Sequence, residues 1–261
     1  MKYLIFISIG LIGGTLSGLL GIGGGVVMIP MLIYFTNTDI KAATAISMVQ
    51  IFFTSSFGSL FNYLEKNIKI RYAFYFGISS MVFSFAGSFL TRYIPETVIK
   101  TTYLFAVTAS LAMFIARSFI TKENNKIAYI NKSDTDTEKK KILKLLPLGA
   151  VAGFIGGILG VGGGFLYVPV LIFFLGLSLK SAIATSLAIV FFSSIPGVIG
   201  KIISVDFNWI TALIISAGAI GGSRLGVYIK SKAKPSAIRI VFIIVLIVII
   251  VRVVIDLISK F

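Results

Sequence analysis

Several apolar runs in this chain are long enough to cross a lipid bilayer, and they restrict its fold more than any other feature. A helix needs about 20 mostly apolar residues to span the hydrocarbon layer. Residues 240–251 contain no polar side chain at all. Overall, 57% of the 261 residues are hydrophobic and 13% are charged, whereas about a quarter of a soluble domain is charged. We therefore predict an all-α integral membrane protein.

The sequence uses one unit twice, at an offset of 139 residues. Residues 10–58 align without a gap with residues 149–197, and 20 of the 49 aligned pairs are identical. The similarity becomes looser farther on, where Gly87–Ser88 resembles Gly222–Ser223. The repeat predicts two homologous membrane halves, at residues 1–120 and 145–261, joined by a hydrophilic cytoplasmic loop at residues 121–144.

Each half contains four apolar segments, and glycines break the first segment of each half. The segments are residues 2–35, 42–61, 72–91 and 98–119, then 145–175, 181–203, 209–229 and 238–257. An opening segment of roughly 30 helical residues would be about 50 Å long, too long for one crossing and too short for two. It is either one broken helix or a re-entrant pair. We favour the re-entrant pair, because it concentrates Lys and Arg on one side. It also makes the four-segment repeats inverted, as in many secondary transporters.

The broken segments carry the motifs GIGGG, at residues 21–25, and GVGGG, at residues 160–164. A helix that restarts after each motif would present free N–H groups and the positive end of its dipole. Two such ends near the midplane would bind an anion without a basic side chain. Alternatively, the glycines only permit tight turns and close packing. The predicted binding glycines are Gly23, Gly24, Gly25, Gly162, Gly163 and Gly164. Prolines that we expect to break or kink helices are Pro30, Pro169 and Pro196.

Four polar side chains inside apolar segments are further candidates for the anion site. Ser47 and Ser186 occupy matched positions and could donate hydroxyl hydrogen bonds, although such serines often bond to their own backbone. Gln50 is either an interhelical contact or a substrate contact. Arg224 is the one charge well inside a segment. It either contacts the substrate or reaches the membrane interface along its apolar stem.

Glycines at a spacing of four residues predict helix packing, not binding. They are Gly10, Gly14 and Gly18, their counterparts Gly149, Gly153 and Gly157, and the set Gly218, Gly222 and Gly226. Each set clears one helix face for the close approach of a neighbour. These faces are also compatible with a homodimer.

The composition excludes several classes of function. The chain has no Cys and no His, which removes the common general base and the usual metal ligands, so we predict no catalytic residues, no metal and no cofactor. The net charge of +15 arises from loops between apolar runs, as the positive-inside rule describes, and not from a nucleic-acid surface. Asp and Glu lie only at loops or segment ends, which favours an anion over a cation.

The doubled stretches GLIGGTLSGLLGIGGGVVMIPML, from Gly10, and GAVAGFIGGILGVGGGFLYVPVL, from Gly149, resemble the duplicated signature of the TauE/SafE sulfite exporter family. GSRLG around Arg224 is similar to an element of that family's second half. The resemblance covers essentially the whole chain. It implies a permease of a bacterial or archaeal inner membrane for sulfite, thiosulfate or an organosulfonate such as sulfoacetate.

Our leading hypothesis is a secondary carrier of a small sulfur-containing anion that works by alternating access. A passive anion channel is the alternative within transport. A membrane scaffold without transport activity is the alternative from another class. Flux measurements with reconstituted protein distinguish the three.

Overall fold

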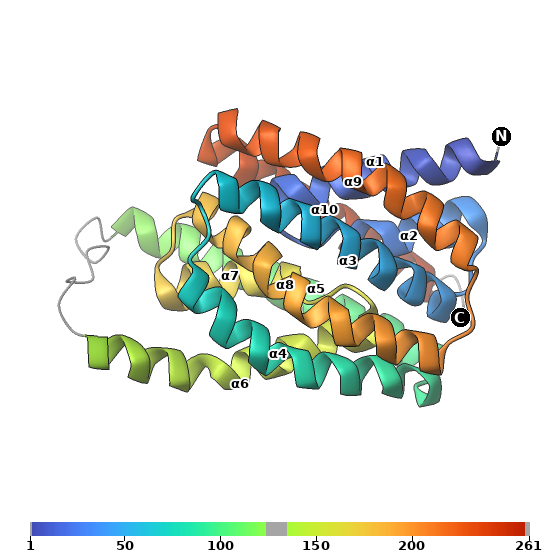
Figure 1. Cartoon of the computed structure of the whole chain (residues 1–261), viewed down its shortest axis with the longest axis horizontal. Coiled ribbons are helices and arrows are strands. Elements are labelled where there is room, and N and C mark those ends of the chain that lie inside the picture. The colour runs from blue at the N-terminus through green and yellow to red at the C-terminus, as the bar shows by residue number, and fades with distance from the viewer. Residues whose placement is uncertain (1, 124–134, 259–261) are drawn as a thin grey trace.

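The computed structural model describes residues 2–123 and 135–258, and these residues form α-helices without any strand. The first half contains α1 (Lys2–Leu20), α2 (Gly25–Thr36), α3 (Ile40–Leu64), α4 (Ile70–Leu90), the short 3-10 helix η1 (Thr91–Tyr93) and α5 (Glu96–Glu123). The second half contains α6 (Thr135–Leu159), α7 (Gly164–Leu175), α8 (Leu179–Ser204), α9 (Trp209–Lys232) and α10 (Pro235–Ile258). Figure 1 shows them as a bundle with largely parallel and antiparallel axes. The predicted all-α class is confirmed.

The predicted hydrophilic loop is shorter than we expected from composition. Helix α5 continues to Glu123 and α6 begins at Thr135, so helices extend into both ends of the predicted loop at 121–144. The remainder, residues 124–134, lies outside the described residues. Composition alone cannot place such boundaries, because charged residues extend a helix readily.

Seven of the described helices are long and apolar enough to cross a membrane: α1, α3, α4, α5, α8, α9 and α10. The outer surface of the bundle is apolar as well. Phe105 is 72% exposed and Val82 is 69% exposed. Water-facing surfaces rarely display large apolar patches, so we assign this outer surface to contact with lipid chains.

The two halves interlock, since the opening helix of each half packs against a helix of the other half. Helix α1 lies along α9, and α6 lies along α4. A Cβ atom added at Gly14 would lie 2.7 Å from Cα of Ala219, and one at Gly153 would lie 2.8 Å from Cα of Ser80. Only glycine permits this approach, so the predicted packing role of the glycines at spacing four is confirmed.

The same contacts extend the 139-residue correspondence to α4 and α9. Gly87 of α4 lies against Phe154, and Gly226 of α9 lies against Thr15; both residues of the first pair are 139 positions from those of the second. The resemblance of Gly87–Ser88 to Gly222–Ser223 is therefore wrong by about one helical turn. Looser sequence similarity allowed this slip because glycines recur every four residues on α9.

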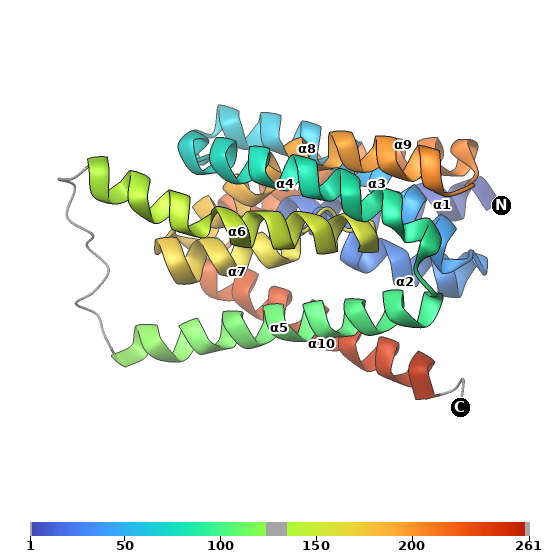
Figure 2. The same cartoon turned by 90° about the horizontal axis from the view of Figure 1, so that it is seen from below.

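The helix pair that opens each half folds back on itself. Helix α2 ends near the end of the bundle at which α1 begins, and α7 ends near the opposite end, at which α6 begins (Figures 1 and 2). The turns between the paired helices lie inside the bundle. The two glycine motifs therefore lie in the interior of the bundle.

None of the three prolines interrupts its helix. Pro30 lies inside α2, Pro169 inside α7 and Pro196 inside α8. The expectation that they break helices is corrected, because the breaks lie at the glycines. Proline removes one backbone donor and frees the carbonyl four residues earlier, and the helices of Pro30 and Pro169 satisfy that carbonyl in another way, described below.

Candidate functional site

The two glycine breaks have the same backbone conformation. Gly21, Gly23 and Gly24 have φ angles of 72°, 77° and 80°, and the matched Gly160, Gly162 and Gly163 have φ angles of 65°, 67° and 74°. Glycine is the residue that adopts this left-handed region without steric cost. Gly24 and Gly163 precede the first residues of α2 and α7, so each break aims a helix N-terminus into the interior.

The two breaks contact one another across the repeat. A Cβ atom added at Gly164 would lie 2.8 Å from the carbonyl oxygen of Gly21, and one at Gly25 would lie 3.0 Å from that of Gly160. Ile51 and its counterpart Val190 pack beside both breaks. The predicted glycines of the two halves therefore meet in one buried centre, where the first residue of each helix lies against a backbone carbonyl of the other break.

Ser47 of α3 and Ser186 of α8 make matched hydrogen bonds to the breaks. Ser47 Oγ donates to the carbonyl oxygen of Gly160 at 2.8 Å, and Ser186 Oγ donates to that of Gly21 at 2.5 Å. Each serine thus binds the break of the opposite half. A hydroxyl has one hydrogen to donate, so in this conformation the serines hold the breaks together and do not present donors to an anion.

Gln50 lies beside the first break. A Cβ atom added at Gly24 would lie 3.1 Å from Gln50 Nε2, and that nitrogen donates to Thr54 Oγ1 at 3.2 Å. Gln50 is fully buried, and its Oε1 has no hydrogen-bond partner among the described residues. Its counterpart in the second half is Ile189. The repeat therefore does not duplicate this amide.

Helix α5 supplies a hydroxyl to each helix that follows a break. Tyr103 Oη donates to the carbonyl oxygen of Val26, and Ser110 Oγ donates to that of Phe165 at 2.6 Å. These two carbonyls are the ones that Pro30 and Pro169 leave without their usual N–H partner. Helix α5 thus compensates both prolines and holds α2 and α7 in place.

Arg224 does not lie with the other predicted site residues. Its side chain is exposed on α9, with Cζ 5.9 Å from the centroid of the Phe61 ring. Gly222 and Gly226 turn the opposite face of α9 toward α1. Two residues correspond to about 200° around a helix, so Arg224 points away from the packed face.

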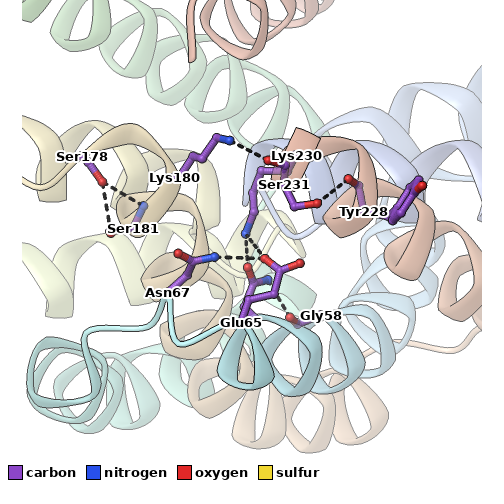
Figure 3. A network of polar contacts seen from close by, with 10 residues as sticks. Gly58, Glu65, Asn67, Ser178, Lys180, Ser181, Tyr228, Lys230 and Ser231 are labelled. Atoms are coloured by element: carbon purple, nitrogen blue, oxygen red, sulfur yellow. Dashed lines mark hydrogen bonds and ion pairs between the residues drawn. The ribbon is translucent and has the colours of Figure 1, made fainter. Parts of the chain in front are cut away.

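Two lysines that the sequence analysis did not single out, Lys201 and Lys230, are fully buried. Lys230 Nζ bonds to Asn62 Oδ1 and lies 4.0 Å from Glu65 Oε2. Figure 3 shows this network, in which the nearby Lys180 also donates to the carbonyl oxygen of Ser231. Lys201, by contrast, is bonded to three neutral oxygens. The signal in the sequence was the polar pair Asn62 and Lys201 at matched positions.

Comparison with known proteins supports one assignment. The family model for the sulfite exporter TauE/SafE matches residues 6–253. The chain is 29% identical over 259 residues to the probable membrane transporter protein YunE of Bacillus subtilis (strain 168), covering 94% of this chain and 95% of that one. It is 30% identical over 252 residues to the probable membrane transporter protein MJ0441 of Methanocaldococcus jannaschii, covering 90% and 89%.

No solved structure matches the chain. The family match nevertheless spans both glycine breaks and almost every described helix. Its relatives come from a bacterium and an archaeon and are named as membrane transporters. The chain therefore belongs to the sulfite exporter TauE/SafE family and is a multi-pass transporter of the cell membrane.

Proposed function

We propose that this transporter is a secondary carrier of a small sulfur-containing anion such as sulfite, thiosulfate or an organosulfonate. The observation that carries the proposal is the meeting of two glycine breaks, which directs the N-termini of α2 and α7 into one buried centre. Helix N-termini attract anions through free N–H groups and the helix dipole. The name of the matched family supports the choice of a sulfur oxyanion.

We place the substrate between the breaks, where it would replace the carbonyl contacts that now link them. Gly23, Gly24, Gly25, Gly162, Gly163 and Gly164 would supply backbone donors, and Gln50 would supply an amide donor. Ser47 and Ser186 would hold the breaks in register, or turn toward the anion after the carbonyls move away. In this proposal the halves are inverted in the bilayer, and each break serves one face of the site.

Burial of the centre favours a carrier over a passive channel. Ser47, Gln50 and Ser186 are fully buried, whereas an open pore would expose its binding residues to water. Alternating access requires a closed centre that opens to one side at a time. Helices α2 and α7 would move for this opening, because each is joined to its half by a glycine break.

Proteoliposomes loaded with sulfite, thiosulfate, sulfoacetate, acetate or chloride test the proposal. We expect saturable flux and counterflow of at least one sulfur-containing anion, together with loss of flux in Gly163→Leu. The matched control is Gly221→Leu, since a Cβ atom at Gly221 meets only a distant side-chain atom of Leu11, at 4.0 Å. Flux without counterflow would indicate a channel. Absence of exchange for every anion would leave the scaffold hypothesis.

A further inference from the structure

Lys201 is a fully buried cation whose three hydrogen-bond partners are all neutral. Its Nζ donates to Thr44 Oγ1 at 2.9 Å, to Thr91 Oγ1 at 2.7 Å and to the carbonyl oxygen of Ile158 at 2.9 Å. These partners come from α3, η1 and α6. Three oxygens thus satisfy the donors of Nζ, and none of them belongs to a carboxylate.

The orientation of both threonines is fixed by their other hydrogen bonds. Thr44 Oγ1 donates to the carbonyl oxygen of Lys41 at 2.7 Å. Thr91 Oγ1 lies 3.2 Å from the carbonyl oxygens of Gly87 and Ile158 and donates its hydrogen there. Each hydroxyl therefore accepts from Lys201, and the cage consists of acceptors without a negative charge.

A buried ammonium group without a carboxylate partner costs several kcal/mol of desolvation free energy. Lys230 shows how this chain compensates such a cost, because Glu65 lies 4.0 Å from its Nζ. At Lys201 the neighbouring charged group is a second cation, Lys41. Intramembrane charges that packing does not need are typical of substrate pathways. An anion is the partner that this cage lacks.

A pocket at the same end of the bundle lies beside this cage and shares Thr44 with it. It is lined by residues of α2, α3, α5, α6 and α10, among them Thr44, Leu159 and Lys100. Thr44 is a direct partner of Lys201, and Leu159 follows Ile158 in the chain. Lys100 pairs with Asp256 in the pocket wall. The pocket therefore touches one member of the Lys201 cage, Thr44, while Lys201 itself is fully buried behind it.

We propose that Lys201 is the counter-charge for the transported anion at this end of the molecule. The ligand is a small oxyanion or a sulfonate group, which would take the place of the Ile158 carbonyl on the ammonium while the hydroxyls of Thr44 and Thr91 turn to donate. This inference rests on the proposed anion transport. Ile158 lies in the last turn of α6, two residues before Gly160. Replacement of its carbonyl would free the turn that precedes the second break, and this couples the anion to movement of α7.

The test combines anion binding by calorimetry in detergent with transport kinetics in proteoliposomes, using sulfite and sulfoacetate. Loss of a hydrogen bond to a charged group predicts that Lys201→Met weakens binding and raises KM by about 10- to 100-fold. Lys201→Arg keeps the charge, so we expect a smaller loss. Lys41→Met is the matched control, because it removes the same charge at the same end, and it should leave KM within about twofold of the wild type.

Thermal unfolding separates this role from a structural one. If Lys201 only stabilised the fold, Lys201→Met would lower Tm in anion-free buffer. We expect an unchanged or higher Tm, because the substitution removes an uncompensated buried charge. Added sulfite should raise Tm in the wild type and not in Lys201→Met.

Wild-type affinity and KM in Lys201→Met would overturn the inference and leave the proposed function intact. Binding that depends on Lys201 without any flux would support the anion site and overturn the carrier function. If Lys201→Met does not fold, the anion affinity of Lys201→Arg and Thr91→Val tests the inference, since each substitution alters the cage with less disturbance. Wild-type anion affinity in both would overturn the inference.

Discussion

The centre of the bundle and its two ends use the internal repeat in different ways. At the centre, matched residues form matched bonds: Ser47 binds Gly160, and Ser186 binds Gly21. Gln50, by contrast, has the apolar counterpart Ile189. A binding centre that serves both sides of a membrane in turn must present equivalent geometry to each side. Near-symmetry at the centre is therefore what alternating access requires.

At the ends, matched positions hold different residues. Asn62 and Lys201 correspond, as do Thr91 and Lys230, each pair separated by 139 residues. The contacts correspond as well, since Lys230 bonds to Asn62 and Lys201 bonds to Thr91. Among the described residues each end thus has one fully buried lysine, but on a different helix, and Glu65 accompanies only Lys230. We infer that this difference gives the two sides of the membrane unequal affinity for the anion.

The largest effect is expected from alanine at the first glycine of either break. Gly21 and Gly160 have positive φ and are crowded by the backbones of Ile183 and Thr44. Left-handed strain of about 1–2 kcal/mol adds to overpacking of about 1–3 kcal/mol. Both Gly21→Ala and Gly160→Ala should lower the free energy of unfolding by roughly 3 kcal/mol, as measured by denaturation in detergent.

Gly176→Ala is the control for these two variants. Gly176 has φ 63° but no heavy atom within 4 Å of an added Cβ, so only the strain of about 1 kcal/mol remains. If Gly21→Ala and Gly160→Ala lowered the free energy of unfolding by different amounts, the two glycine breaks would not be structurally equivalent. If Gly176→Ala lowered the free energy of unfolding as much as the other two variants, crowding would not be the cause of their destabilisation.

A smaller and equal effect is expected from the two serines. Ser47→Ala and Ser186→Ala each remove one neutral hydrogen bond from a helix to the break of the opposite half, worth about 1 kcal/mol. Because the two breaks that accept these bonds contact one another, the double variant should depart from additivity by about 0.5 kcal/mol or more. Thr108→Val is the control, as that exposed hydroxyl bonds within its own helix. Strict additivity would mean that the two bonds act independently.

The sequence predicted the features that depend on local backbone or on length. Glycine triplets indicated the breaks because few other residues adopt positive φ, and small residues every four positions indicated close packing. The sequence did not predict the acceptors of the buried hydroxyl groups, because Ser47 donates to a carbonyl group 113 residues away in the chain. Lys201 lies three residues before the end of α8, where a lysine can extend to the membrane interface, so its position alone did not mark it as buried. Its burial follows from the packing of α3, α4 and α6 around it.

Arg224 gives the smallest expected effect and sharpens the comparison of the two ends. Like Lys201, it is a cation inside an apolar helix, but its contact is an exposed one with the ring of Phe61, 5.9 Å away. Such contacts contribute about 0.5–1 kcal/mol. Arg224→Gln should therefore shift Tm slightly and leave the KM for sulfite within about twofold, measured beside Lys201→Met. If Arg224→Gln weakened transport as much as Lys201→Met, the charge that distinguishes the two sides would lie on the outer face of α9 and not in the buried cage.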